Sequence, residues 1–216
     1  MAEPATRLTL ITPAIDDAEA FAPRLAEACA AGDVASVLAR FAEADERTLT
    51  KRVKALAPAA QEAGAAFVIE VPGDLDRAAI LTRGGADGVQ VSGERAVREL
   101  RGRLKGDRIV GAAGIRSRDD AMAIGEAGAD YLLFGEPRPD GSVPALEGVA
   151  ERAAWWAEIF ETPCIAYAPS LEAVAALAAT GAEFVALGDA VWNHPEGPAA
   201  AVRQALEALA RAEAPR

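Results

Sequence analysis

Short runs of apolar residues recur along this chain, and longer segments with apolar residues at every third or fourth position separate them. Apolar runs that do not alternate with polar residues, and that glycine or polar residues bound, are typical of strands buried on both faces of a parallel sheet. The longer segments have the period of helices that pack one face against such a sheet. The pattern therefore predicts strands and helices in strict alternation.

The expected strands share this compact apolar character. They span residues 8–11, 34–38, 67–69, 88–91, 108–111, 131–134, 163–167 and 184–187. The expected helices lie at residues 16–31, 48–63, 74–84, 95–104, 117–127, 147–160, 170–178 and 198–212. Thr12 and Pro13 are expected to end the first strand, and Thr48, Asp74, Ser117 and Ser170 to cap helices. Pro58 is expected to kink the second helix or to divide it.

One sequence motif, glycine followed by alanine and an acidic residue, occurs three times along the chain. Gly85-Ala86-Asp87, Gly128-Ala129-Asp130 and Gly181-Ala182-Glu183 each stand between an expected helix and an expected strand. Glycine adopts the left-handed conformation that closes a helix, because it has no Cβ. A small residue, an acid and a buried strand then follow. Three copies indicate three helix–strand units of one parallel sheet.

Eight strand–helix units account for the whole chain of 216 residues. A (β/α)₈ barrel that forms one domain over residues 1–216 fits this count best. A doubly wound open sheet is the alternative. In a barrel, the functional residues lie at the carboxyl ends of the strands, so the loops that follow the strands are the place to look for a site.

Composition excludes several classes of partner. The formal net charge is −11, which disfavours nucleic acid and membrane surfaces. No apolar run approaches the ~20 residues of a membrane-spanning helix, and the first residues lack the order of a signal peptide. Cys29 and Cys164 have no metal-ligand spacing, and buried unpaired thiols suit a reducing compartment. We therefore expect a cytoplasmic protein.

Basic and small residues after the expected strands indicate an anionic ligand. Arg40, Arg95, Arg116 and Arg138 all follow strands, and guanidinium groups bind phosphate by paired hydrogen bonds. Ser170 and Gly188 follow the last two strands, where such barrels often hold a phosphate. The candidate binding set for a phosphorylated small molecule is Thr12, Arg40, Gln90, Arg116, Arg138, Ser170 and Gly188. The alternative is that each arginine is a solvated loop residue and Ser170 a plain helix cap.

Few residues suit acid–base or covalent catalysis. Lys51, Lys54 and Lys105 do not end strands, which disfavours a Schiff-base mechanism, and His194 lies in a loop well after the last strand. Carboxylates near the strand ends are Glu70, Asp74, Glu94, Glu136 and Asp189. Glu70 and Glu94 are the candidate ligands for Mg²⁺, which prefers one or two carboxylates together with substrate phosphates. The catalytic residues are left unassigned.

The order of motifs resembles the thiamine phosphate synthase family, including its thiazole tautomerase branch. The resemblance is carried by Leu10-Ile11-Thr12, by residues 85–89 and 109–111, by residues 128–135 and by residues 181–186. It implies a TIM barrel that joins hydroxymethylpyrimidine diphosphate to thiazole phosphate and releases pyrophosphate with Mg²⁺. Arg40 matches the arginine of the family's Gln-x-Arg-Glu-Lys pattern, and Glu94 matches the Glu of its Gln-Glu-Asp.

The chain departs from the family pattern at several site positions. Gln90 stands where the family has histidine, and Arg95 where it has a metal-binding aspartate. Residues 113–115 replace a Ser-Thr-His run, which removes the tautomerase histidine. Ala168-Pro169 replaces a Gly-Gly phosphate loop, and Glu70 with Val71 replaces an Asn-Asp pair. Arg138 is the candidate substitute for the family's lysine.

Three hypotheses follow. The first is a barrel of this family that retains phosphate-ligand binding but has lost or changed the transfer chemistry. The second is an active synthase with Arg40 and Arg138 on the diphosphate and Glu70 or Glu94 on Mg²⁺. The third is a structural or interaction barrel without a small-molecule site. Trp155, Trp156 and Trp192 are either interface aromatics of a homo-oligomer or buried against the barrel.

Overall fold

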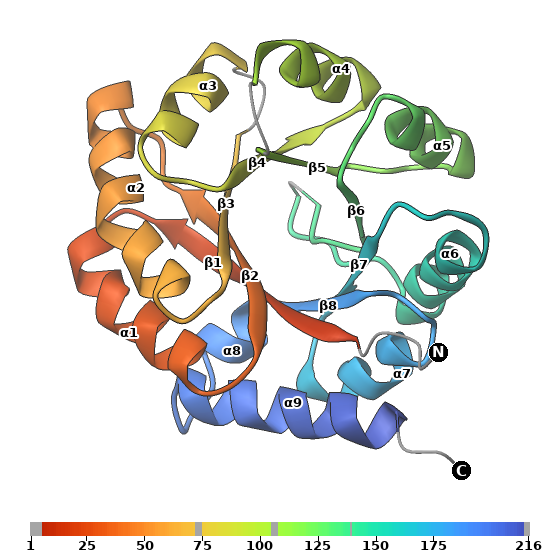
Figure 1. Cartoon of the computed structure of the whole chain (residues 1–216). Coiled ribbons are helices and arrows are strands. Elements are labelled where there is room, and N and C mark those ends of the chain that lie inside the picture. Colours follow the sequence, from red (N-terminus) through yellow and green to blue (C-terminus); the bar gives the residue numbers. More distant parts are fainter. Residues whose placement is uncertain (1–5, 72–74, 105–107, 139, 214–216) are drawn as a thin grey trace.

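The computed structural model describes residues 6–71, 75–104, 108–138 and 140–213 and shows one closed barrel (Figure 1). Strands β1 to β8 pair in chain order, every neighbouring pair is parallel, and β8 closes the ring on β1. This confirms the (β/α)₈ barrel and rules out the open sheet. The strands are Arg7–Ile15, Val34–Phe41, Ala66–Glu70, Gly88–Ser92, Ile109–Ala113, Tyr131–Phe134, Cys164–Ala168 and Phe184–Leu187.

The first strand is longer than the sequence predicts. β1 continues through Thr12 and Pro13 to Ile15, so the expected stop at these residues is wrong. Its register with β2 shifts between Ile11 and Ala14. An irregularity of this kind leaves residues out of the ladder, and proline, which has no N–H, is tolerated there.

Helices surround the barrel and cover its outer face (Figure 1). They are α1 (Ala18–Ala30), α2 (Glu46–Gln61), α3 (Leu75–Arg83), α4 (Glu94–Arg103), α5 (Arg118–Glu126), α6 (Leu146–Ile159), α7 (Val174–Ala178), α8 (Asp189–Trp192) and α9 (Pro198–Glu213), with a 3₁₀ turn η1 (Leu171–Ala173) before α7. The turn and α8 are not expected from the sequence. Helix α2 runs through Pro58 without division, so the split expected there does not occur.

Two of the expected helix caps are wrong and one is confirmed. Asp45 caps α2, since its Oδ1 accepts a hydrogen bond from the Thr48 N–H at 2.8 Å, whereas Thr48 lies inside the helix. Ser170 precedes η1 but makes no side-chain cap. Ser117 forms a capping box with Asp120 at the start of α5. The expected cap Asp74 and the expected rim residue Lys105 lie outside the described residues.

The three Gly-Ala-acid motifs form the same hydrogen bond between neighbouring strands at the amino-terminal rim of the barrel, which we call a clamp. Each acid lies just before a strand and accepts a hydrogen bond from a backbone N–H of the preceding strand. The bonds are Phe67 N to Asp87 Oδ2 at 2.7 Å, Val110 N to Asp130 Oδ2 at 2.7 Å and Cys164 N to Glu183 Oε2 at 2.9 Å. Each motif therefore joins the start of its own strand to the start of the preceding strand.

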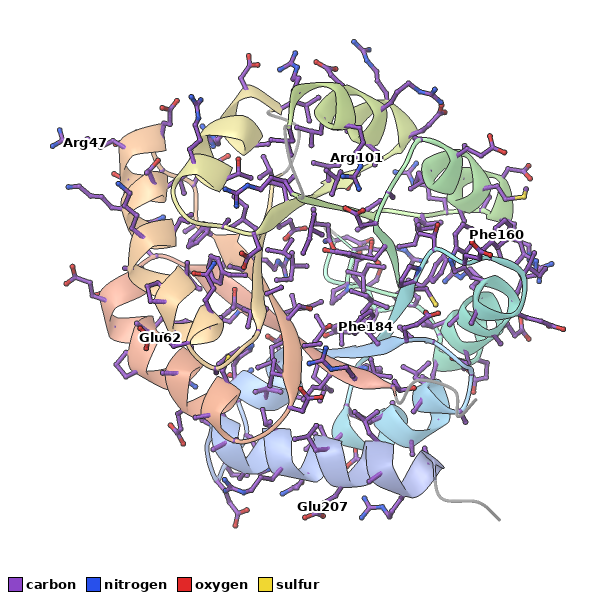
Figure 2. All side chains as sticks on the ribbon, in the orientation of Figure 1. Arg47, Glu62, Arg101, Phe160, Phe184 and Glu207 are labelled. Carbon is purple, nitrogen blue, oxygen red and sulfur yellow. The ribbon has the colours of Figure 1, made fainter. Side chains whose placement is uncertain are left out.

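Side chains fill the inside of the barrel, including Phe184 at the start of β8 (Figure 2). The strand register arranges them in layers contributed by alternate strands. The layer nearest the carboxyl ends holds Ile11, Glu70, Ala113 and Tyr167. The layer beneath it holds Leu38, Gln90, Leu133 and Ala186. Polar residues thus enter an otherwise apolar interior only near the carboxyl-end mouth and around Thr9 and Ser36, which bond each other at 2.9 Å.

Candidate functional site: the carboxyl-end mouth

A row of polar side chains crosses the inner wall of the mouth from β2 to β6. Glu70 is the register partner of Gln90, Gln90 of Gly111, and Gly111 of Tyr131. Arg40 extends the row on β2, one residue beyond the Ala39–Ile69 pair. Register partners on parallel strands point to the same face of a sheet. The register therefore brings Arg40, Glu70 and Gln90 together near the carboxyl ends of their strands, although they are far apart along the chain. Tyr131 begins β6, deeper in the barrel.

Arg40 and Glu70 form an ion pair at the rim. Arg40 Nε lies 2.8 Å from Glu70 Oε2, and their side chains are 42% and 37% exposed. Thr12 holds the strand beneath this pair, since its Oγ1 accepts a hydrogen bond from the Arg40 N–H at 2.9 Å and donates one to the Pro13 carbonyl. Thr12 is 1% exposed, so it positions Arg40 instead of facing a ligand.

Gln90 and Tyr131 form a hydrogen bond inside the barrel. The Tyr131 hydroxyl donates to Gln90 Oε1 at 3.0 Å, and Gly111 leaves room for the ring, because a Cβ at Gly111 would lie 2.0 Å from Tyr131 Cζ. Burial, with the charges of Glu70 and Asp130, raises the Tyr131 pKa, so the phenol stays protonated and donates. The oxygen of the Gln90 amide thereby accepts a hydrogen bond, and its nitrogen remains available as a donor.

Glu136 is a half-buried carboxylate in the loop after β6. Its Oε1 accepts a hydrogen bond from the Gly114 N–H at 2.6 Å and so joins the loops after β5 and β6. Burial raises the pKa of Glu136, the Gly114 bond and the Arg152 charge oppose the rise, and the charge of Glu70 adds to it. This carboxylate therefore holds a proton more readily than an exposed glutamate.

Tyr167 and Gly188 meet on the opposite wall. A Cβ at Gly188 would lie 3.2 Å from the Tyr167 hydroxyl oxygen, so a larger residue here would crowd the phenol. Burial and the charge of Asp189 raise the Tyr167 pKa, whereas the charge of Arg40 lowers it. Arg40 and Asp189 therefore lie close enough to act on the hydroxyl, which is a proton donor at the mouth. The sequence analysis did not assign Tyr167 a role, although its place at the end of a predicted strand was a usable signal.

Comparison with known proteins identifies the family. The family model described as thiamine monophosphate synthase matches residues 8–191. The chain belongs to this thiamine monophosphate synthase family. It is 42% identical over 199 residues to the thiamine-phosphate synthase of Rhodospirillum centenum, covering 91% of this chain and 94% of that protein. It is 40% identical over 211 residues to the thiamine-phosphate synthase of Hyphomonas neptunium, covering 93% and 92%.

Solved structures agree on the architecture. The thiamine phosphate pyrophosphorylase of Pyrococcus furiosus has a TM-score of 0.73 to this chain at 23% identity, and the comparison covers 97% of this chain and 98% of that one. At this level of identity the likeness bears on the fold. The family resemblance that the motifs indicate and the barrel that the residue pattern predicts are both confirmed.

Several of the predicted site residues in this synthase-family barrel lie apart from the polar row. Arg116 is exposed before α5, where its N–H donates to the Asp120 carboxylate. Arg138 is exposed and bonds Ser142 within its own loop, with Nη1 at 3.2 Å from Ser142 Oγ. The Ser170 hydroxyl bonds the Glu172 carboxylate and lowers its pKa. Of the predicted arginines, Arg40 is therefore the one with a described contact inside the mouth.

The carboxylates described at the mouth do not fit the Mg²⁺ that the family implies. Glu70 is paired with Arg40, and Glu94 lies on α4 with its Oε1 2.5 Å from Arg98 Nη2. Among the residues that the structure describes, no group of three or more histidine, cysteine, aspartate or glutamate side chains is placed to hold a metal ion. Arg95, exposed at the start of α4, adds positive charge near Glu94. Glu70 and Glu94 thus belong to separate ion pairs.

The remaining sequence predictions concern the outside of the barrel. Trp156 and Trp192 are buried, and Trp192 Nε1 donates to the Ile11 carbonyl at 2.7 Å. Trp155 packs against Trp156 and carries Arg118 over its ring. These aromatic residues thus have partners within the chain. No helix in the described ranges is long and apolar enough to cross a membrane.

Proposed function

We propose that this protein synthesises thiamine phosphate, the activity for which its relatives are named, and that its mouth binds the phosphorylated precursors. The observation that carries the proposal is the similarity to two thiamine-phosphate synthases, at 42% and 40% identity over more than nine-tenths of each chain. The reaction that the family resemblance implies joins hydroxymethylpyrimidine diphosphate to thiazole phosphate. It breaks the bond to the diphosphate and releases pyrophosphate.

Arg40 is the residue best placed to assist this reaction. The reaction is dissociative, so it requires stabilisation of the departing diphosphate more than activation of a nucleophile. A guanidinium group with fixed orientation stabilises such an anion through paired, charge-assisted hydrogen bonds. Glu70 orients Arg40 through the 2.8 Å contact at Nε, and Thr12 fixes the backbone below it. In this proposal, Arg40 binds the diphosphate, and Glu70 and Thr12 position Arg40.

A second candidate function is phosphate-ligand binding without transfer. It is favoured by the loops after β5 and β7, where residues 113–115 and Ala168-Pro169 stand in place of the family's polar Ser-Thr-His and Gly-Gly segments. Proline offers no N–H to a phosphate, and Ala168 is fully buried. Under this candidate the mouth binds a thiamine precursor but does not convert it.

An activity assay separates the two. The purified chain is mixed with hydroxymethylpyrimidine diphosphate and thiazole phosphate, with and without Mg²⁺, and thiamine phosphate is measured by chromatography. We expect product well above the no-enzyme control, and Arg40→Ala to lower kcat/KM by about tenfold or more, because a charge-assisted hydrogen bond contributes about 1.5–3 kcal/mol. The matched control is Arg47→Ala, which removes an arginine that points outward from α2 (Figure 2).

A thermal-shift measurement tests whether the chain binds the precursors without converting them. A precursor at 100 times its Kd should stabilise the folded chain by about 2.7 kcal/mol, which raises its melting temperature. A thermal shift without product supports the second candidate. If there is no product and neither precursor shifts the melting temperature, both candidate functions are contradicted. The remaining interpretation is then a structural barrel.

A further inference from the structure

Three of the carboxylates described at the mouth are committed to partners within the protein. Glu70 pairs with Arg40, and Glu136 accepts the Gly114 N–H at 2.6 Å in a site where burial favours its protonated form. Glu94 pairs with Arg98 along α4. Mg²⁺ needs ionised oxygen ligands arranged as part of an octahedron. Asp189, exposed at the start of α8, has no such partner among the described residues, but one carboxylate supplies only a single corner of that octahedron.

The groups left over at the mouth are hydrogen-bond donors. Tyr167 is 6% exposed and Gln90 1% exposed, and neither the Tyr167 hydroxyl nor the Gln90 amide nitrogen bonds a described protein group. Among the described residues, no side-chain nitrogen or oxygen that is sealed from solvent lacks a partner. These two atoms are therefore reached by solvent.

Arg40 lies beside this pair of donors. It pairs with Glu70, which shares a layer of the barrel with Tyr167, and it stands in the same row of register partners as Gln90. A cation with two neutral donors is complementary to the oxygens of a phosphoryl group, which only accept hydrogen bonds. These donors are side chains on the barrel strands, whereas a phosphate loop would bind the anion with backbone N–H groups.

We propose that Arg40, the Tyr167 hydroxyl and the Gln90 amide bind the phosphoryl group of the ligand without a divalent cation, and that Glu70 is a counter-charge that restrains Arg40. The inference rests on the phosphate-binding mouth of the proposed function and defines how the anion is bound. Gln90 and Tyr167 become binding residues, and Tyr131 becomes a positioning residue, because its hydrogen bond turns the Gln90 nitrogen toward the ligand.

The role of Glu70 determines the sign of one mutation. As a counter-charge, Glu70 competes with the bound anion for the Arg40 guanidinium and repels the anion. Replacement by glutamine, which keeps the shape and removes the charge, then strengthens anion binding. As a metal ligand, Glu70 would contribute to binding, and the same replacement would weaken it.

The test is isothermal titration of the full chain with pyrophosphate, first in EDTA and then in excess Mg²⁺. We expect saturable binding in EDTA, with an affinity that Mg²⁺ changes by less than about threefold. Glu70→Gln should tighten binding about two- to fivefold, in line with the strength of a half-exposed ion pair. Arg40→Ala and Tyr167→Phe should weaken it about tenfold or more. Thr50→Ala, on the outer helix α2, is the control that should change nothing.

Three further variants separate binding from folding. Arg40→Lys keeps the charge but loses the paired geometry, so an intermediate affinity is expected. Tyr131→Phe should weaken pyrophosphate binding by disordering the Gln90 amide, whereas Gln90→Glu should abolish it by putting an acceptor in place of the donor. A far-ultraviolet circular dichroism melt of each variant shows whether the barrel is intact, and only intact variants are compared.

Pyrophosphate binding that requires Mg²⁺, or that Glu70→Gln weakens, overturns the inference. So does the absence of binding under both conditions. These outcomes differ from failure of the proposed function. A chain that binds pyrophosphate in EDTA and yet makes no thiamine phosphate supports the inference and refutes the transfer. A chain that makes product but binds pyrophosphate only with Mg²⁺ supports the proposed function and refutes the inference.

Discussion

At the scale of single residues, the site depends on small side chains as much as on polar ones. Gly111 leaves the space into which Tyr131 extends to reach Gln90, and Gly188 leaves the space beside the Tyr167 hydroxyl. In a closed barrel the interior volume is shared between strands, so a large residue on one strand requires a small one on its neighbour. The Tyr131–Gln90 bond and the position of the Tyr167 hydroxyl therefore both depend on a neighbouring glycine.

Gly111→Ala should destabilise the barrel. The new Cβ would lie 2.0 Å from Tyr131 Cζ, and overpacking of this kind costs about 1–3 kcal/mol or more. In a Tyr131→Ala background the ring is absent, so the same substitution should cost less than about 1 kcal/mol. Urea unfolding of the four proteins in this double-mutant cycle measures the difference. Equal costs in both backgrounds would show that the ring does not occupy the space above Gly111.

At the scale of elements, the repeated clamp joins a sequence pattern to a stability role. Asp130 bonds the Val110 N–H at 2.7 Å and pairs with Arg101 on α4, whose Nε also donates to the Gly128 carbonyl at 2.6 Å. One carboxylate thus connects a helix, a helix stop and two strands. The clamps lie at the amino-terminal rim, away from the mouth, where such barrels place residues that serve stability.

Asp130→Ala should lower the free energy of unfolding by about 1–3 kcal/mol, because it leaves the Val110 N–H without its partner. Asp130→Asn keeps an acceptor oxygen and loses only the charge, so it should cost less. The measurement is chemical denaturation of both variants, and pyrophosphate affinity should stay at the wild-type value. If the two variants lower the free energy of unfolding equally, the ion pair with Arg101 accounts for the loss. The hydrogen bond to Val110 is then not the source of the stability.

Element types followed from the sequence more reliably than element ends. The strands are set by buried apolar runs, which packing fixes, and their order closes the barrel as predicted. Caps depend on one hydrogen bond, and Asp45 and Thr48 are both good cap residues three positions apart, so the pattern alone chose the wrong one. The short helix α8 has too few residues to show a helical period. For the site, Arg40, Glu70 and Gln90 could be predicted because they end or fill strands.

Arg116, Arg138 and Ser170 were weaker predictions for a physical reason. Loop residues carry no period, and a side chain at the start of a helix can turn outward or bond its own loop, as the Arg138 contact with Ser142 shows. Tyr131 and Tyr167 were read as apolar strand residues, since a phenol ring fits a buried strand as well as phenylalanine does. Only the register, which sequence does not reveal, places the Tyr131 hydroxyl against Gln90 and the Tyr167 hydroxyl beside Gly188.

At the scale of the whole molecule, the mouth influences stability as well as binding. Burial and the nearby Glu70 raise the pKa of Glu136 above that of the unfolded chain. The folded protein therefore holds this proton more tightly, and the stabilisation is fully present at acidic pH and is lost as pH rises through the folded-state pKa. Groups such as Asp33 beside Arg7, whose pKa is lowered, act in the opposite direction at lower pH.

Glu136→Gln should remove this part of the pH dependence. The free energy of unfolding of the wild type should fall, relative to that of the variant, as pH rises from about the ordinary glutamate value of 4.5. Urea unfolding at closely spaced pH values from 4 to about 8 checks this. Parallel curves for the two proteins would indicate that Glu136 titrates normally, and a gap that widens toward acid in favour of the variant would reverse the sign.

The pairing of β1 with β8 has a consequence for how the chain is made. Strand β1 leaves the ribosome before the other seven strands, yet its partner Phe184–Leu187 leaves after all of them. Throughout synthesis a partly built sheet therefore exposes two unsatisfied edges, and such edges invite pairing with other chains. Arrival of the last strand removes both at once, so a nascent chain that stalls before it should aggregate far more readily than the finished protein.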